Sequence, residues 1–244
     1  MNLIIDIGNT CAKLVAFDGY EPIEELRVDK GEWHLLRSFC NKYDFEKGIC
    51  SSVVGFDEEV SSALSSLTFP LMRLVCGKTQ VPVKCAYLTP ETLGADRLAA
   101  VVAANYLQPG RNILVVDIGT CITFDFISAE GIYEGGNISL GPTMRLKALH
   151  EFTAKLPLVE RRGTAPDMGN TTETAIRSGV VLGVKYEVEG YVKHFMEKHP
   201  DLLVYLTGGV HMDLHFSERI PTFANDFIVP IGLNRILEYN NELS

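Results

Sequence analysis

One short segment near the N-terminus occurs twice in the chain. Residues 3–10 read LIIDIGNT and residues 114–120 read LVVDIGT, which places Asp6 and Asp117 at equivalent positions. In both copies a β-branched apolar run, typical of a buried strand, ends in Asp, an apolar residue, Gly and a hydroxyl-bearing residue before strand-like sequence resumes. Each copy therefore predicts a β-hairpin whose turn carries a carboxylate and a hydroxyl. The duplication predicts two similar domains, facing each other across a cleft, within 244 residues.

The rest of the chain alternates strand and helix patterns, which indicates an α/β protein. A Thr-Pro-Glu start and Ala- and Leu-rich sequence predict a helix over residues 89–107. The Gln-Pro-Gly-Arg segment that follows marks a boundary between domains at residues 1–107 and 108–244. The other expected elements are two helices, a strand and a last helix, at residues 144–156, 173–198, 202–206 and from Leu233 onward. An apolar stripe supports the longest helix: Ile176, Val180, Val184, Val188 and Val192.

The composition of the chain argues against nucleic-acid and membrane partners. Asp and Glu outnumber Lys and Arg by 31 to 22, and no Lys/Arg-rich stretch occurs, so we expect no nucleic-acid partner. The longest apolar stretch, near residues 98–104, is far shorter than the roughly 20 residues of a membrane span, and the N-terminus lacks a signal-peptide pattern. We therefore expect a cytoplasmic protein without a membrane partner. The six cysteines form no CxxC pair and are expected to be buried free thiols.

The repeated turn suits phosphate binding. Glycine allows backbone N–H groups to approach an anion, the small hydroxyls add donors, and Lys13 adds a positive charge to the first copy. An Asp in such a turn needs a cation, usually Mg²⁺ held through waters, between itself and a phosphate. A single copy would be read as an ordinary Asp-Gly hairpin, but two copies favour phosphate binding. Two further loops, residues 135–142 and 207–209, are plain turns when taken singly and parts of a nucleotide cleft when taken together.

The segment at residues 94–97, Gly-Ala-Asp-Arg, has two interpretations. An adjacent Asp–Arg pair early in a helix is often a solvated ion pair or cap. In a phosphotransferase, Asp96 could instead accept the proton of an attacking hydroxyl, and Arg97 could bind a substrate carboxylate or the transferring phosphoryl group.

Several motifs in this order resemble the type III pantothenate kinases. They include DIGNTCAK at residues 6–13, Tyr87 seven residues before GADR, DIGT at residues 117–120, the glycine loop and TGG. AKLP at residues 154–157 and the segment 170–179 match as well, whereas residues 18–85 match only loosely. The Asp-x-Gly-Thr turns alone specify the wider superfamily of acetate kinase, sugar kinases, heat-shock proteins and actin. GADR with Tyr87 at this spacing selects the family.

The resemblance implies two actin-like (ribonuclease H-like) domains that catalyse ATP-dependent phosphorylation of pantothenate to 4′-phosphopantothenate, the first step of coenzyme A biosynthesis. The resemblance also implies a homodimer with active sites at the interface. It further implies that the enzyme uses ATP, Mg²⁺ and a monovalent cation, K⁺ or NH₄⁺. Asp96 would be the proton acceptor, Asp117 would hold the monovalent cation, and Asp6 would hold Mg²⁺ through water. ATP would contact Asp6, Ile7, Gly8, Asn9, Thr10, Cys11, Ala12, Lys13 and Thr120. Pantothenate would contact Tyr87, Gly94, Ala95, Asp96, Arg97 and Thr172, and Thr172 would reach the neighbouring subunit's pantothenate.

Two departures and two rival interpretations accompany this resemblance. The glycine loop ends Ser-Leu-Gly-Pro at residues 139–142, where the family has an Ala-rich segment ending Pro-Gly, and Cys11 and Ala12 replace residues that are commonly polar. The rivals are a superfamily kinase acting on a sugar or small acid, and a non-catalytic ATP-binding or accessory protein. His211 and His215 have the four-residue spacing of metal ligands but follow a Gly-Gly turn, and we expect surface histidines.

Overall fold

The computed structural model describes residues 1–210, 214 and 221–243. The chain forms two compact units: unit 1 comprises Met1–Gly110, Ile127–Gly135 and Phe227–Ser244, and unit 2 comprises Arg111–Phe126 and Gly136–Asp226. The first break, at Gly110/Arg111, lies near the expected boundary at residue 107. The last helix belongs to unit 1, although the predicted division assigned it to the second half. The division into domains at 107/108 stays a prediction. His211 and His215 lie outside the described residues.

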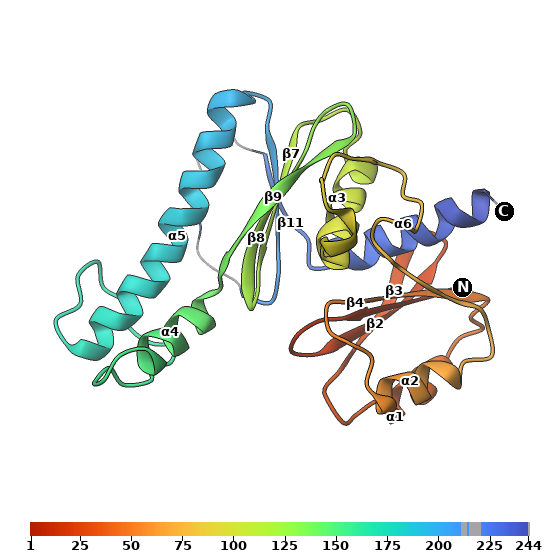
Figure 1. Ribbon diagram of the computed structural model, residues 1–244, viewed down its shortest axis with the longest axis horizontal. Coiled ribbons are helices and arrows are strands. Elements are labelled where there is room, and N and C mark those ends of the chain that lie inside the picture. The colour runs from red at the N-terminus through yellow and green to blue at the C-terminus, as the bar shows by residue number, and fades with distance from the viewer. Residues whose placement is uncertain (211–213, 215–220, 244) are drawn as a thin grey trace. The chain divides into compact units, whose positions relative to one another are not determined.

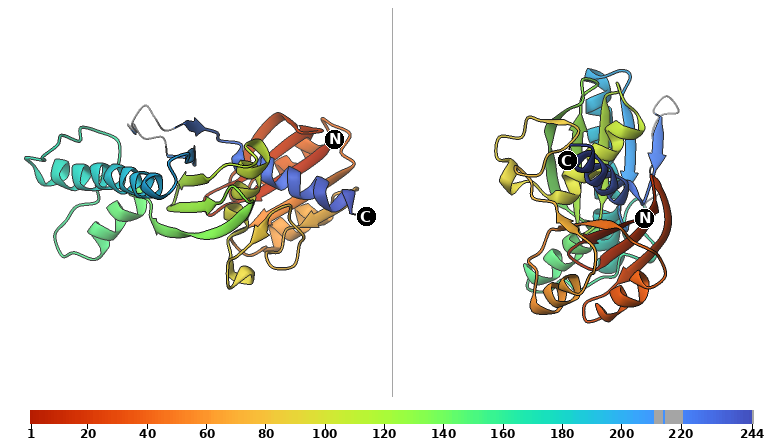
Figure 2. Two further views of the ribbon diagram at one scale, coloured as in Figure 1. Left: turned by 90° about the horizontal axis from the view of Figure 1, so that it is seen from above. Right: turned by 90° about the vertical axis from the view of Figure 1, so that its right-hand side faces the viewer.

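Unit 1 is built on a twisted sheet with the strand order β3-β2-β1-β4-β5 (Figure 1). Its strands are β1 (Asn2–Ile7), β2 (Ala12–Asp18), β3 (Glu21–Val28), β4 (Lys47–Ser52) and β5 (Leu71–Arg73). Helices α1 (His34–Cys40) and α2 (Glu58–Ser65) cover one face, and α3 (Ala95–Leu107) and α6 (Ile228–Glu242) cover the other (Figures 1 and 2). The short strand β6 (Lys84–Cys85) and the 3₁₀ turn η1 (Pro90–Thr92) lie between α2 and α3 in sequence.

The alternation of side chains along β1 explains this two-layer packing. Leu3 and Ile5 are fully buried in the core that contains Leu36 and Phe39 of α1, whereas Ile4 points to the opposite face and is equally buried. Both faces of the strand are therefore covered, as its continuous apolar sequence predicts.

Unit 2 repeats this topology. The strands are β7 (Ile113–Ile118), β8 (Cys121–Ile127), β9 (Ile132–Leu140), β10 (Leu203–Thr207) and β11 (Thr222–Ala224), in the order β9-β8-β7-β10-β11. In both units the first three strands form one half of the sheet in reverse order, and the fourth and fifth strands follow on the other side of the first. The shared order confirms the duplication predicted from the repeated segment. The β9 strand begins in unit 1, where it pairs in parallel with β6.

The long helix α5 (Thr172–Lys198) covers one face of the second sheet, and α4 (Pro142–Glu151) lies beside its N-terminal turns (Figure 2). The predicted stripe is buried: its C-terminal members Val184, Val188 and Val192 pack on the sheet, and its N-terminal members contact Leu146 of α4. A capping box between Thr171 and Thr174 begins the helix.

Three predicted helix bounds are wrong in detail. The helix expected from residue 89 begins only at Ala95, because Gly94 is its N-cap and the preceding residues form η1. The helix expected over residues 144–156 spans Pro142–Glu151, since proline suits the first helical position. The last helix begins at Ile228, five residues before Leu233, because Pro230 sits in the first turn, where its missing N–H costs nothing.

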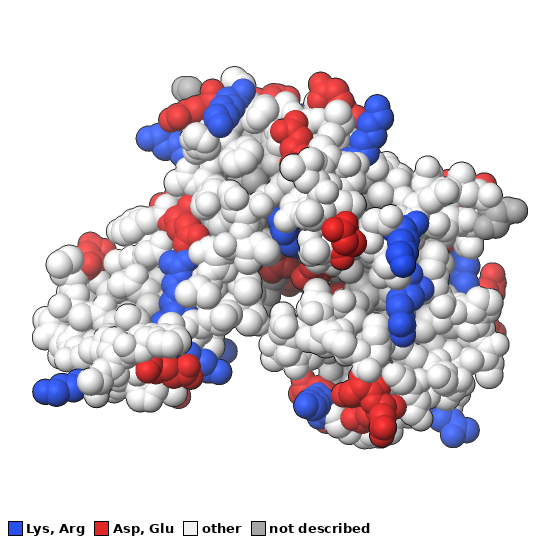
Figure 3. All heavy atoms as spheres, viewed as in Figure 1, with Lys and Arg blue, Asp and Glu red and all other residues white. Residues whose placement is uncertain are grey.

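The surface and the thiols can be compared with the expectations from composition. On the face drawn in Figure 3, Lys and Arg side chains are interspersed with Asp and Glu side chains. No helix within the described ranges is long and apolar enough to cross a bilayer. All six cysteines are free thiols, but only Cys50 and Cys76 are buried, and Cys85 is exposed. The expectation of buried thiols was therefore wrong for Cys85, and Cys11, Cys40 and Cys121 are only partly buried.

Candidate functional site in each unit

In unit 1, the first repeated turn places Asp6 between two polar neighbours. Asp6 lies opposite Lys13 in the antiparallel β1–β2 pair and opposite Ser51 in the parallel β1–β4 pair. The buried Ser51 hydroxyl donates a hydrogen bond of 2.9 Å to Asp6 Oδ1. The turn itself is closed by Gly8 N–H, which donates to the carbonyl oxygen of Cys11 at 3.1 Å. The carboxylate is thus fixed at the C-terminal edge of the sheet, where open α/β sheets bind ligands.

The electrostatic surroundings of Asp6 oppose its charge. Burial raises the pKa of the Asp6 carboxyl to about 6, and the Ser51 hydrogen bond lowers it in part. The Asp96 carboxylate raises the same pKa further, and the Lys13 ammonium lowers it. Two carboxylates of unit 1 are therefore close enough to influence each other, which is the arrangement that favours a bound cation.

Asp96 occupies the first turn of α3. Its Oδ1 accepts a hydrogen bond of 2.8 Å from the backbone N–H of Arg97, at the positive end of the helix dipole. Arg97 itself is only 5% exposed, so the pair is no solvated surface ion pair. The structure thus disfavours the interpretation of Asp96 and Arg97 as a solvated ion pair.

Two stacked tyrosines lie beside Arg97 in unit 1, next to the predicted pantothenate-binding residues. Tyr87 stacks on Tyr133 with ring centroids 6.1 Å apart and an interplanar angle of 2°, and the Arg97 guanidinium carbon lies 5.8 Å from the Tyr87 ring centroid. Tyr133 is fully buried, so it fixes the plane of Tyr87. Tyr87 and Arg97 are ten residues apart in sequence, and the structure brings the two side chains together.

In unit 2, the second repeated turn is packed between two glycines. Thr207 lies opposite Asp117 in the parallel β7–β10 pair, as Ser51 lies opposite Asp6. Gly208 has φ +103, and a Cβ there would come within 2.5 Å of Asp117 Oδ1. On the other side Gly141 N–H donates to Thr120 O at 3.0 Å, and a Cβ at Gly141 would lie 2.2 Å from Gly119 O. Gly141 and Gly208 therefore both contact the turn that carries Asp117 and Thr120. The prediction of a loop over residues 135–142 was wrong for residues 135–140, which form the C-terminal part of strand β9.

The donor sets limit which ions these turns fit. The described part of the chain contains no group of three or more His, Cys, Asp or Glu that could hold a metal. One or two carboxylates with waters and substrate phosphates suit Mg²⁺, which matches Asp6 with its neighbour Asp96. A single carboxylate, Asp117, tightly packed against backbone at Ile118 and Gly208, offers the hard oxygen donors that an alkali cation prefers.

Thr172 lies in another part of unit 2. It is the first residue of α5, it is exposed, and it lines an apolar cavity of about 840 Å³ between α4 and α5.

The remaining predicted site residues lie in unit 1. Those of the first loop form the end of β1, the turn and the start of β2: Ile7, Gly8, Asn9, Thr10, Cys11 and Ala12. Gly94 and Ala95 form the N-cap and first residue of α3.

Two residues of the site were missed from sequence. Ser51 lies near the C-terminal end of β4, a strand that the sequence analysis did not predict, so no sequence signal indicated it. Tyr133 lies in β9, 46 residues from Tyr87, and no local pattern connects the two. Both contacts depend on strand order, which sequence periodicity does not specify.

The raised pKa of Asp6 predicts a pH-dependent gain in stability when Asp6 is replaced by Asn. Because the folded-state pKa of about 6 exceeds the ordinary value of 3.8, ionised Asp6 destabilises the fold at neutral pH. In Mg²⁺-free buffer, Asp6→Asn should raise the free energy of unfolding by up to about 3 kcal/mol at pH 7.5. The gain should fall to about half of this at pH 5, because Asp6 is then largely protonated in the folded state and still largely ionised in the unfolded state.

Urea unfolding at the two pH values measures this gain. The control is Asp18→Asn, an exposed carboxylate on β2, which should change stability by less than about 0.5 kcal/mol. A gain that is independent of pH, or a loss of stability at pH 7.5, would contradict the assigned electrostatics.

Comparison with known proteins assigns the chain to a family. The profile of the type III pantothenate kinase family matches residues 2–194. A type III pantothenate kinase from Phocaeicola vulgatus is 49% identical over 243 residues, which cover 100% of both chains. Among solved structures, a Campylobacter jejuni protein described as a candidate Baf family transcriptional activator has a TM-score of 0.61 and 20% identity, covering 98% of this chain and 99% of that one.

A second solved structure shows the wider fold class. The ROK hexokinase from Thermus thermophilus has a TM-score of 0.52 at 13% identity, covering 99% of both chains. The two structural likenesses show the fold alone, an α/β fold of the actin-like ATPase and sugar kinase type. The match of the family profile and the full-length relative show more. The chain belongs to the type III pantothenate kinases, the enzymes that phosphorylate pantothenate in coenzyme A biosynthesis.

Proposed function

We propose that the protein transfers the γ-phosphoryl group of ATP to the primary hydroxyl of pantothenate, with Asp96 accepting the hydroxyl proton. The placement of Asp96 carries this proposal. Its carboxylate lies at the N-terminal turn of α3, in electrostatic contact with the Asp6 turn and next to the buried Arg97. A general base of this kind needs to reach one hydroxyl while cations hold the phosphates, because phosphoryl transfer requires little covalent chemistry from the protein.

The phosphate side is assigned to the first turn. We assign the ATP phosphates to the loop from Asp6 to Lys13, with Thr120 as a contact from unit 2. The closed turn at Gly8 and the ammonium opposite Asp6 support this assignment. Mg²⁺, when bound, would neutralise charge on the phosphates, and Asp6 would orient it through water.

The pantothenate side is assigned to residues around the aromatic pair. Pantothenate carries a carboxylate, and the Arg97 guanidinium beside Tyr87 is a suitable partner for it. Gly94 and Ala95 would contribute backbone donors at the start of α3, and Thr172 would contribute a hydroxyl to the neighbouring subunit's pantothenate. This assignment extends the resemblance of the motif and is supported by the stacking of Tyr87 on the buried Tyr133.

A monovalent cation, K⁺ or NH₄⁺, is assigned to Asp117. The close packing of Gly208 on the Asp117 carboxylate and on the Ile118 backbone supports a small oxygen-lined site. The cation would supply positive charge near the phosphates. A single carboxylate, that of Asp117, would hold it.

We also propose that the enzyme is a homodimer with its active sites at the interface, and that it works in the cytoplasm. Exposed apolar side chains of unit 2 support the dimer: Phe152 is 85% exposed and Leu140 is 45% exposed, and both line the cavity that contains Thr172. Six free thiols support a reducing compartment.

The assay that tests this proposal is ADP release from Mg²⁺ and ATP on addition of pantothenate, in K⁺ buffer and again in Na⁺ buffer. We expect pantothenate-dependent turnover in K⁺ that falls at least tenfold in Na⁺. Equal turnover in both buffers would remove the role assigned to Asp117 while keeping the kinase. Absence of pantothenate-dependent turnover in either buffer, with folding confirmed, would contradict the proposed function. Light scattering on the same preparation should give twice the 27.0 kDa of one chain.

A further inference from the structure

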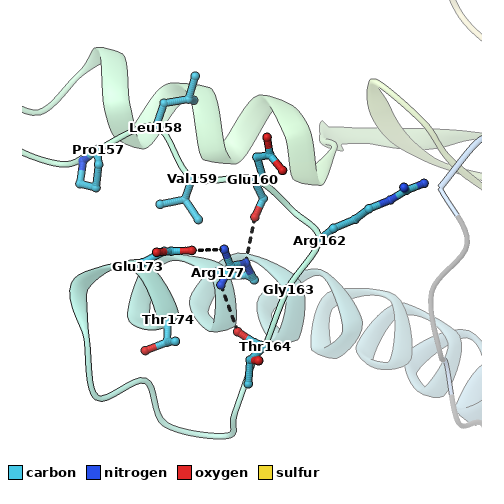
Figure 4. Close-up of a pocket in the computed structure, with 10 residues that line it drawn as sticks. All are labelled: Pro157, Leu158, Val159, Glu160, Arg162, Gly163, Thr164, Glu173, Thr174 and Arg177. Carbon is cyan, nitrogen blue, oxygen red and sulfur yellow. Dashed lines mark hydrogen bonds and ion pairs between the residues drawn. The ribbon is translucent and has the colours of Figure 1, made fainter.

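A buried arginine connects the start of α5 to the segment that precedes it. Arg177, in the second turn of α5, is only 6% exposed. Its Nε donates to the carbonyl oxygen of Glu160 at 2.9 Å, and its Nη1 donates to that of Thr164 at 3.2 Å. Its Nη2 forms an ion pair with Glu173, one turn earlier in the same helix (Figure 4). The three groups that accept from Arg177 come from three directions around one planar guanidinium.

Two of these acceptors belong to the strap, defined here as residues 152–171 between α4 and α5. The strap has no helix or strand over its whole described length. Its one buried apolar anchor is Val159, which packs with Leu146 and Ile176. The second anchor is polar, since Arg177 bonds two strap carbonyls and Gly163 lies against it so closely that a Cβ there would come 2.8 Å from Arg177 Cζ. The guanidinium is therefore the hydrogen-bonding centre of a segment without regular structure of its own.

The strap ends directly at Thr172. Thr171 caps the helix, Thr172 is its first residue, and Glu173, the next residue, is held by Arg177. The position of the Thr172 side chain consequently depends on the strap on one side and on the Glu173–Arg177 ion pair on the other. A lysine could not replace this arrangement, because one ammonium cannot reproduce the fixed fork of a guanidinium.

We propose that Arg177 is a positioning residue for pantothenate binding, which holds the strap and Thr172 in the geometry that the substrate requires. The inference rests on the proposed role of Thr172 in the pantothenate site. Arg177 itself is directed into the strap and not toward the cavity that Thr172 lines, since that cavity is bounded by other residues. Loss of Arg177 should therefore weaken the binding of pantothenate. It should leave the binding of ATP, which we assign to the Asp6 and Asp117 turns, unchanged.

Steady-state kinetics of Arg177→Met and Arg177→Lys in the full-length enzyme test this. We expect the KM for pantothenate to rise at least tenfold in both variants, with the KM for ATP changed less than twofold. If Arg177→Met folds poorly, Glu173→Gln keeps the test open, because it removes only the exposed ion-pair partner and should raise the KM for pantothenate about threefold. Guanidinium ion should partly restore a low KM in Arg177→Ala and should have no such effect on the wild type.

Arg162→Met is the matched control. Arg162 also belongs to the strap. Together with Arg177 it lines a second pocket, of about 620 Å³, but Arg162 is exposed and its side chain points away from Arg177 (Figure 4). Its removal should change the KM for pantothenate by less than twofold. An equal rise of both KM values in Arg177→Met, or a lower melting temperature with both KM values unchanged, would overturn the inference.

Thr172→Val separates this inference from the proposed function. If Thr172→Val raises the KM for pantothenate and Arg177→Met does not, the positioning role fails while the substrate site stands. If Thr172→Val leaves the KM unchanged, the role of Thr172 fails and the inference that depends on it fails too. A wild-type enzyme without pantothenate-dependent turnover would instead contradict the proposed function itself.

Discussion

Replacing Asp96 with Asn should lower kcat by about 10²–10⁴-fold, the usual contribution of a general base. The amide can still accept the hydrogen bond from the Arg97 N–H, so the start of α3 should keep its structure. The nucleotide side should also be preserved, because the Asp96 charge raises the pKa of Asp6 and its removal leaves Asp6 more fully ionised. We therefore expect an unchanged melting temperature and a KM for ATP within about threefold of the wild type, measured by thermal unfolding and steady-state kinetics.

The control for this variant is Glu91→Gln. Glu91 is an exposed carboxylate in η1, five residues before Asp96, and it has no proposed contact with substrate. It should retain kcat within twofold. Full turnover in Asp96→Asn, or an equal loss in both variants, would show that Asp96 is not the base.

The duplication and the longest helix could be predicted because local sequence determines them. The two LxxDIG segments specify strand, turn and strand directly, and the observed sheets repeat the same strand order. For α5, the stripe from Ile176 to Val192 lies within one segment, so its spacing alone predicts the helix. The starts of α3 and α6 were less predictable, since a proline three residues into a helix and a glycine N-cap fit more than one boundary.

The site was predictable only where its residues lie in one motif. Asp6 with Lys13, and Asp96 with Arg97, are close in sequence, and the structure places each pair together. Ser51, Tyr133 and Arg177 were missed because their partners come from strands or loops that only the tertiary fold brings near. Each of them holds a motif residue or its segment in place. Ser51 and Tyr133 belong to no motif, and Arg177 lies in the matching segment 170–179 without having been singled out.

The departure at residues 139–142 has a structural explanation. Gly141 is the N-cap of α4 and packs against the backbone of Gly119 and Thr120, and Pro142 occupies the first helical position. In this chain, Pro142 therefore begins α4 and Gly141 contacts the second turn. The family match excludes a sugar kinase as the primary assignment, although sugar kinases share the fold.

Replacing Gly232 with Ala should destabilise unit 1 strongly. Gly232 lies in α6 where it crosses α3, and a Cβ there would lie 1.8 Å from the carbonyl oxygen of Ala99. Since the obstructing atom is backbone, the helices must separate, which costs about 1–3 kcal/mol or more. A fall in melting temperature of roughly 5–10 °C should result, as measured by differential scanning calorimetry.

Gly190→Ala is the matched control, with the opposite sign expected. Gly190 is an exposed helical residue of α5 with no atom within 4 Å of an added Cβ, so alanine should raise the melting temperature by about 2–4 °C through helix propensity. Gly232→Ala should also lower kcat/KM beyond what its stability loss explains, because Ala99 and Asp96 share one helix and a shift of α3 displaces the carboxylate from the hydroxyl it serves. Normal kcat/KM in a destabilised Gly232→Ala enzyme would mean that the position of Asp96 does not depend on the α3–α6 contact.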